Sequence, residues 1–164
     1  MAISRLNHAV LYVRDVRRTG DFYRDVLGFQ DVVADPSGRF LFLRAPGGDG
    51  PRGVNHHDIA FFAIGERAHD SQAGRTTVGL YHLAWEVESI GELAEMRRRL
   101  SDAGSLVGAS DHGVSKSLYA RDPDGIEFEI MWRVPTHLWG DMEHEAIIEP
   151  LNLDAEIARY SEIV

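Results

Sequence analysis

The chain has 164 residues, of which 44% are hydrophobic and 26% charged, a balance typical of a globular protein and not of a disordered tail or a fibre. Its formal net charge of −9 argues against a nucleic-acid partner. The chain contains no cysteine, which excludes disulfides, thiolate metal sites and cysteine nucleophiles and leaves histidine, acidic and tyrosine side chains for any demanding chemistry. No segment has the apolar run of a signal peptide or the roughly 20 apolar residues of a membrane helix, so we expect a cytoplasmic protein that does not bind membranes.

The first half of the chain predicts one strand, one helix and three further strands. The first strand, at 6–13, carries His8 at its third position. A helix follows, with Thr19 as its candidate cap and Gly28 as its candidate end. Three extended stretches come next, at 29–34, 39–44 and 58–64. Because strands favour aromatic side chains without any ligand, we assign four phenylalanines of these stretches to the core, namely Phe40, Phe42, Phe61 and Phe62.

The second half repeats this order of elements. A strand at 80–87 again has a histidine, His82, at its third position, 74 residues after His8. Ser89 and Glu92 form the pattern of a capping box, and the apolar residues that follow recur every three or four positions, as on the buried face of a helix. Three extended stretches are predicted at 106–109, 116–120 and 126–132.

The repeat predicts an α+β fold in which two βαβββ modules form a curved mixed sheet. We expect a single domain that divides into a first module at about 3–65, a polar linker at 66–79, a second module at about 80–132 and a C-terminal extension at 133–164. The extension ends in a short amphipathic segment, and we expect it to pack across a sheet edge or the mouth of a pocket.

Polar residues on corresponding strands point to a metal at the centre of this sheet. His8 and His82 lie on the first strand of each module. A shift of 72 residues relates His57 to Glu129 on the last strands. Two histidines and one carboxylate suit a divalent metal and leave positions open for substrate and dioxygen. Strand alternation puts Glu127 and Glu129 on one face, so the pattern leaves open which of the two binds.

Two segments carry a family resemblance. The paired modules and the segment 122–130, DPDGIEFEI, resemble the vicinal oxygen chelate superfamily, which includes glyoxalase I, bleomycin-resistance proteins and extradiol ring-cleavage dioxygenases. In that family the carboxylate ligand follows the DPDG turn, at the position of Glu129. The segment 111–122, DHGVSKSLYARD, is similar to the stretch of type I extradiol dioxygenases that supplies a supporting histidine and a substrate-contacting tyrosine, which implies these roles for His112 and Tyr119.

The same resemblance, to one-domain forms of these dioxygenases, implies a ligand set and a proton-transfer residue. It implies that His8, His82 and Glu129 hold Fe(II), with Mn(II) as a second option for the same ligands. It also implies that His57, which stands in a His-Asp pair, acts as an acid/base residue in preference to His56.

These roles imply an extradiol, catechol 2,3-type dioxygenase whose partners are a small aromatic diol and dioxygen. The first alternative is a glyoxalase-like metal-dependent isomerase or lyase, which would favour a carboxylate near the end of the first module, where this chain has His57. The second alternative is a small-molecule binding or resistance protein without turnover. We also expect a homodimer or a larger homo-oligomer.

Overall fold

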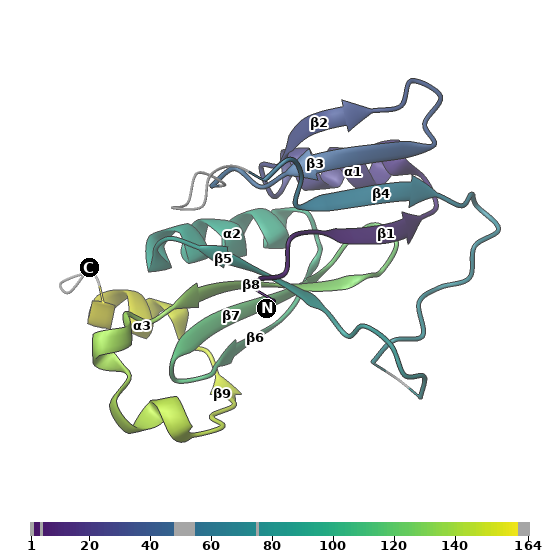
Figure 1. Ribbon diagram of the computed structural model, residues 1–164. Helices are drawn as coiled ribbons and strands as arrows, with labels where there is room; N and C mark the ends of the chain where they lie inside the picture. The colour runs from purple at the N-terminus through teal and green to yellow at the C-terminus, as the bar shows by residue number, and fades with distance from the viewer. Residues whose placement is uncertain (1, 4, 48–54, 75, 161–164) are drawn as a thin grey trace. The chain divides into compact units, whose positions relative to one another are not determined.

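The structure, a computed structural model, describes residues 2–3, 5–47, 55–74 and 76–160. The chain forms two compact units, Met1–Asp70 (unit 1) and Ser71–Val164 (unit 2); each has its own sheet, with one helix described in unit 1 and two in unit 2 (Figure 1). Residues 48–54 of the predicted first module and 161–164 of the predicted extension lie outside the described residues. In the described part of the chain, no helix is long and apolar enough to cross a membrane.

Unit 1 is a βαβββ module. Its elements are β1 (Ala9–Val13), α1 (Val16–Asp25), β2 (Gln30–Ala34), β3 (Phe40–Arg44) and β4 (Ile59–Ala63). The sheet has the order β1-β4-β3-β2, in which β1 and β4 are parallel and the other neighbours antiparallel. The helix begins earlier than predicted, because the Asp15 carboxylate accepts hydrogen bonds from the backbone N–H groups of Arg17 and Arg18. Thr19, the predicted cap, is instead buried within α1.

The core of unit 1 lies between α1 and one face of its sheet. Tyr23 of the helix contacts Phe61 of β4, with ring centroids 4.9 Å apart, and Phe61 is fully buried. Phe40, Phe42 and Phe62 alternate with these inward residues and lie half-buried on the other face. The assignment of all four phenylalanines to the core is therefore wrong for these three, because period-two alternation sends them away from the helix.

Unit 2 repeats the module and adds the C-terminal extension. The module comprises β5 (Leu83–Val87), α2 (Ile90–Asp102), β6 (Leu106–Asp111), β7 (Ser115–Arg121) and β8 (Glu127–Arg133). The extension adds short 3-10 turns at Thr136–Leu138 and Gly140–His144, then β9 (Glu149–Pro150) and α3 (Leu153–Tyr160). The strand order is β5-β8-β7-β6-β9, with β5 parallel to β8. The predicted capping box at Ser89 and Glu92 is confirmed, since each side chain accepts from the other residue's backbone N–H.

The helices of unit 2 cover one face of its sheet. Phe128 and Ile130 of β8 are buried on this face, as is Leu93 of α2. Trp132 contacts Tyr160 of α3, with ring centroids 5.0 Å apart. The extension packs along the sheet edge, because β9 pairs antiparallel with the end of β6 (Figure 1). The predicted edge packing of the extension is confirmed, and so is the predicted α+β class with two βαβββ modules and mixed sheets.

Candidate functional site

In each unit, one sheet face points away from the helices, and we call it the distal face. On the distal face of unit 2, Glu129 of β8 stands directly opposite Tyr119 of β7 in the antiparallel register. His82, just before β5, places Nε2 3.1 Å from Oε2 of Glu129. The Glu129 side chain is only 12% exposed. The sequence therefore brings three of its predicted site residues together on one surface.

The His82–Glu129 pair fits a divalent cation. Two ligand atoms each about 2.1 Å from a metal, at a right angle to one another, lie about 3.0 Å apart, close to the separation found here. Nδ1 of His82 is buried and has no hydrogen-bond partner among the described residues. An imidazole that binds a metal through one nitrogen carries its proton on the other. The imidazole nitrogen of His82 and the carboxylate oxygen of Glu129 are donor types that iron, manganese and zinc all accept.

The third predicted ligand, His8, belongs to unit 1. Within either unit, the described residues include no group of three His, Asp or Glu side chains arranged to hold a metal. His8 precedes β1, and its Nδ1 lies 2.8 Å from the side-chain oxygen of Asn7. An amide oxygen only accepts, so Nδ1 carries a proton, and in the neutral ring Nε2 then has the lone pair that a cation can bind. The three-ligand set stays a prediction.

The structure distinguishes the two carboxylates that strand alternation left equivalent. Glu127 lies 3.4 Å from Arg121 and is hydrogen-bonded to Tyr81, which raises the pKa of that phenol. Glu129 instead faces His82 and Tyr119. Glu127 therefore has a cation and a phenol as partners, whereas Glu129 is free to act as a metal ligand beside an imidazole. Sequence reasoning gave no role to Tyr81, and no pattern in its segment marks it.

His112 and Tyr119 form a hydrogen-bonded pair beside this carboxylate. Nε2 of His112 lies 2.8 Å from the Tyr119 hydroxyl, and Nδ1 lies 3.0 Å from the carbonyl oxygen of Ile147 in the extension. The Tyr119 ring also contacts His82, with centroids 5.7 Å apart. Burial, and secondly the charge of Glu129, raises the pKa of Tyr119. The hydroxyl is thus kept protonated and available as a hydrogen-bond donor.

The distal face of unit 1 carries imidazole and aromatic rings. The His57 ring stacks on Phe42 with centroids 4.9 Å apart, and lies 4.5 Å from the ring of His8. Phe42 in turn contacts both Phe40 and Phe62. Burial of the ring, and then the neighbouring His8 and His56, lowers the pKa of His57. This face therefore joins two predicted site residues to an apolar aromatic surface.

The segment before β4 fixes the position of His57. The Asp58 carboxylate accepts hydrogen bonds from the backbone N–H of Ala45 and from the Asn55 side chain, at 2.8 and 2.7 Å. Asn55 also donates to the backbone carbonyl of Asn7, the residue before His8. His56 and His57 approach each other at their Nδ1 atoms, 3.0 Å apart. The two residues of the His-Asp pair therefore differ in role. Asp58 holds the segment before β4 in place through its hydrogen bonds, and His57 contacts the aromatic rings.

The strand register corrects the predicted equivalence of His57 and Glu129. Val10 pairs with Ala60 across β1 and β4, whereas Ala84 pairs with Glu129 across β5 and β8. Because His8 and His82 are equivalent, so are Val10 and Ala84, and the position of Glu129 in unit 1 is therefore Ala60. His57 lies three residues earlier, before the strand begins. The shift of 72 residues was wrong because it ignored the different lengths of the connections.

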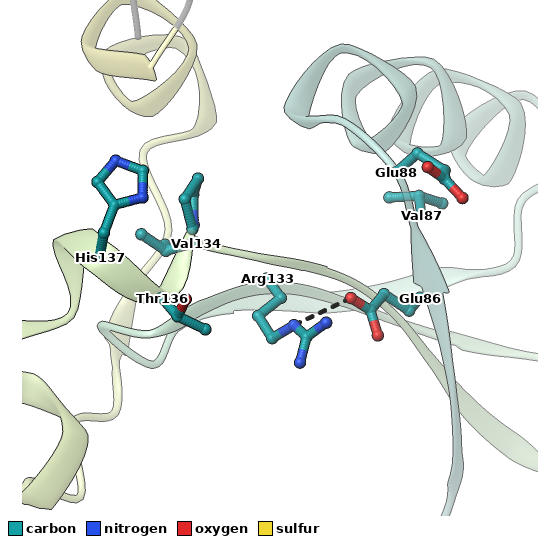
Figure 2. A pocket seen from close by; sticks show the side chains of 8 residues that line it. Glu86, Val87, Glu88, Arg133, Val134, Thr136 and His137 are labelled. Atoms are coloured by element: carbon teal, nitrogen blue, oxygen red, sulfur yellow. Dashed lines mark ion pairs between the residues drawn. The ribbon is translucent and has the colours of Figure 1, made fainter. Parts of the chain in front are cut away.

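A separate cavity of about 620 Å³ lies in unit 2 where β5 and β8 end. Figure 2 shows Arg133 and Glu86 paired in it, with Nε and Oε1 3.1 Å apart. Glu88 and His137 also line it. None of the predicted site residues does so, and sequence reasoning gave His137 no role. The cavity is polar and lies toward the far end of β8 from Glu129.

Comparison with known proteins places these observations in a family. The family model described as "Glyoxalase/Bleomycin resistance protein/Dioxygenase superfamily" matches residues 5–130. A catechol-2,3-dioxygenase of Bacillus subtilis (strain 168) is 30% identical over 156 residues, which cover 93% of this chain and 50% of that protein. The chain therefore spans only half the length of this relative.

Relatives with another activity and a solved structure also match. A lactoylglutathione lyase of Neisseria meningitidis is 28% identical over 134 residues, covering 77% of this chain and 89% of the lyase. A glyoxylase/bleomycin resistance protein/dioxygenase domain from Frankia sp. EAN1pec superposes with a TM-score of 0.65 at 24% identity, covering 88% of this chain and all of that structure. The structural match supports the fold, and the relatives differ in the reaction they perform.

Proposed function

Because the chain belongs to the glyoxalase/bleomycin resistance protein/dioxygenase superfamily, we propose that it is an extradiol ring-cleavage dioxygenase acting on a catechol-type diol. The observation that carries the proposal is the cluster on the distal face of unit 2. There the His82–Glu129 pair stands beside a hydrogen-bonded tyrosine and histidine, Tyr119 and His112. The similarity to a catechol-2,3-dioxygenase over most of the chain supports the same reaction.

His8, His82 and Glu129 would hold the cation, with Fe(II) as the expected ion and Mn(II) accepted by the same ligands. When bound, that ion would supply the Lewis acidity and electron transfer that the reaction of a diol with dioxygen requires. In the neutral ring, the hydrogen bond from Nδ1 of His8 to Asn7 selects the tautomer whose opposite nitrogen can bind a metal.

The surrounding side chains would orient the substrate and move its protons. The Tyr119 oxygen would accept a hydrogen bond from a diol hydroxyl, with His112 holding the tyrosine from the other side. His57, a ring with a lowered pKa, would act as an acid/base residue. The aromatic surface around Phe42 offers ring faces against which a flat substrate can stack. In the reaction the carbon–carbon bond next to the two hydroxyls breaks and both oxygen atoms of dioxygen enter the product, a muconic semialdehyde.

A glyoxalase-like reaction is the second candidate, favoured by the similarity to a lactoylglutathione lyase. Such a site would favour a further carboxylate near the end of the first module. This chain has His57 in that region and Ala60 at the register position of Glu129, and neither is acidic. The donor set therefore favours the dioxygenase.

The test begins with the protein loaded anaerobically with Fe(II), then mixed with catechols and air. We expect a yellow ring-fission product and uptake of one dioxygen for each diol consumed. The hemithioacetal of methylglyoxal and glutathione serves as the competing substrate, under nitrogen and with Ni(II), Zn(II) or Mn(II). Isomerisation of that substrate without any diol cleavage would overturn the proposal in favour of the lyase. Stable binding of catechols without turnover of either substrate would indicate a binding protein.

A further inference from the structure

The C-terminal extension contacts the candidate site at one backbone atom. The carbonyl oxygen of Ile147 lies 3.0 Å from Nδ1 of His112. A carbonyl oxygen only accepts hydrogen bonds, so Nδ1 must be the protonated nitrogen. In a neutral ring the other nitrogen, Nε2, then has a lone pair. It accepts a hydrogen bond from the Tyr119 hydroxyl, whose oxygen lies 2.8 Å away. One contact from the extension thus determines which way the Tyr119 hydrogen bond runs.

Packing around a glycine holds Ile147 at this place. A Cβ built on Gly113, the residue after His112, would lie 2.7 Å from Cδ1 of Ile147 and 3.4 Å from the sulfur of Met142. Gly113 also has a φ of +72°, which favours glycine. The bare backbone of this turn therefore lets the extension approach closely enough for its carbonyl to reach the imidazole.

Two further contacts join the extension to the hairpin that carries His112 and Tyr119. Immediately after Ile147 and its neighbour, β9 pairs with the last residues of β6. Farther along, Lys116 of β7 is buried and its Nζ lies 2.5 Å from Asp111 and 3.0 Å from Glu156 of α3. A buried ammonium held between two carboxylates is costly to separate from either, so α3 is tied to the strand pair that presents the site.

We infer that the extension is a positioning element of the site, which fixes His112 in the Nδ1-protonated tautomer through the Ile147 carbonyl and so makes Tyr119 the donor in their hydrogen bond. An extension that only covered apolar surface would have no influence on the imidazole. The tautomer follows from the contacts within unit 2 alone, whereas its effect on turnover rests on the proposed function.

The experiment reads the tautomer directly. Protein labelled with ¹⁵N-histidine is examined by long-range ¹H–¹⁵N correlation at about pH 8.5, about two pH units above the reference pKa of free histidine. The spectrum of His112→Gln identifies the His112 signals by their loss. We expect the wild-type ring to carry its proton on Nδ1. A ring protonated on Nε2 would overturn the inference without any variant.

Ile147→Gly and Ile148→Gly then form a matched pair. Each places one glycine in the same segment, but Ile148 is 76% exposed, and Ile147 packs on Gly113. We expect Ile147→Gly to shift His112 toward the tautomer mixture of free histidine and Ile148→Gly to leave it fixed. Identical spectra for the two variants would contradict the inference. If Ile147→Gly does not fold, Ile147→Ala, which also removes the side chain packed on Gly113, replaces it in the comparison, with Ile148→Ala as its control.

Turnover supplies the second measurement. With an active substrate, we expect Ile147→Gly to lower kcat about 10-fold with little change in KM, since misorienting a hydroxyl that contacts the reacting diol chiefly affects the transition state. In a Tyr119→Phe background the same change should cause no further loss, because the hydroxyl that the imidazole positions is absent. If His112 is protonated on Nδ1 but the protein cleaves no diol, the inference about the extension stands and the proposed function is wrong.

Discussion

The two units share one module and present different chemistry on their distal faces. Unit 1 exposes rings: His57 stacks on Phe42, and Tyr12 of β1 is 72% exposed on the same side. Unit 2 presents a carboxylate, an imidazole and a phenol, in Glu129, His82 and Tyr119. A histidine precedes the first strand in both units, His8 in unit 1 and His82 in unit 2, so the duplicated scaffold retains this one predicted ligand position and diverges elsewhere.

The pair of positions Ala60 and Glu129 shows where the divergence is sharpest. The two residues occupy the same register position, yet one is a methyl group and the other a carboxylate in contact with a histidine. A metal ligand must carry a lone pair, whereas a side chain that only packs against a substrate need not. We therefore interpret unit 2 as the source of most of the predicted metal ligands and the aromatic surface of unit 1 as a surface for substrate packing.

The largest effect is expected from removing the carboxylate of unit 2. Glu129→Gln keeps the shape of the side chain but removes the charge that a divalent cation requires, so turnover should fall by at least about 10³-fold. Glu127→Gln is the matched control, since its partners are Arg121 and Tyr81, and it should lower turnover less than about 3-fold. Steady-state rates after anaerobic Fe(II) loading measure both. Equal losses in the two variants would remove the distinction between these carboxylates.

Neighbouring phenylalanines of β4 separate the two faces of unit 1. Phe61→Ala leaves a cavity under α1 and should lower the free energy of unfolding by about 3–5 kcal/mol. Phe62→Ala, on the distal face, should cost about 1 kcal/mol and instead raise KM for an aromatic diol. Urea titration and initial rates give the two quantities. A stability loss at Phe62 as large as that at Phe61 would show that the distal face is core.

Adjacent histidines test whether unit 1 contributes to the chemistry. His57→Gln should reduce kcat about 10²-fold, the effect typical of losing a general acid or base. His56→Gln should leave kcat within about 2-fold, because His56 is exposed and lies outside the contact with Phe42. Single-turnover measurements at saturating diol separate the chemical step from binding. If His56→Gln proves the more damaging change, the assignment of the His-Asp pair is wrong.

Changes on the helix-covered face of unit 2 are expected to affect stability alone. Lys116→Met leaves Asp111 and Glu156 without their shared cation and should lower the free energy of unfolding by about 1–3 kcal/mol. Asp154→Asn breaks the exposed ion pair between α3 and Arg97 and should cost less than about 0.5 kcal/mol. Thermal unfolding of both variants provides the comparison. A neutral Lys116→Met would mean that the buried ion pairs do not secure the extension.

Much of the fold follows from the sequence because its signals are local and periodic. The eight strands of the two modules and the capping box at Ser89 were predictable from alternation and spacing. The start of α1 was misplaced because Asp15 and Thr19 are both good capping residues, and the apolar face alone does not choose between them. Phe62 was misassigned because consecutive apolar residues are also typical of a strand buried on both faces.

The candidate site was predictable where its members are distinctive side chains. His82, Tyr119, His112 and Glu129 were named from the repeat and the resemblance, and unit 2 brings them together. The Ile147 carbonyl could not be found in this way, because every residue has a carbonyl group and its contact with His112 spans 35 positions. This contact depends on how Ile147 packs around Gly113, and such packing cannot be predicted from the periodicity of the sequence.

Metal content tests most directly the claim that one cation is held by residues of both units. Wild type, His8→Ala, His82→Ala and Glu129→Ala are dialysed anaerobically against limiting Fe(II), and bound iron is counted for each chain. We predict one tightly bound ion in the wild type and its loss in all three variants, with the fold intact by circular dichroism. Retention of stoichiometric iron by His8→Ala would contradict the shared site and confine metal binding to unit 2.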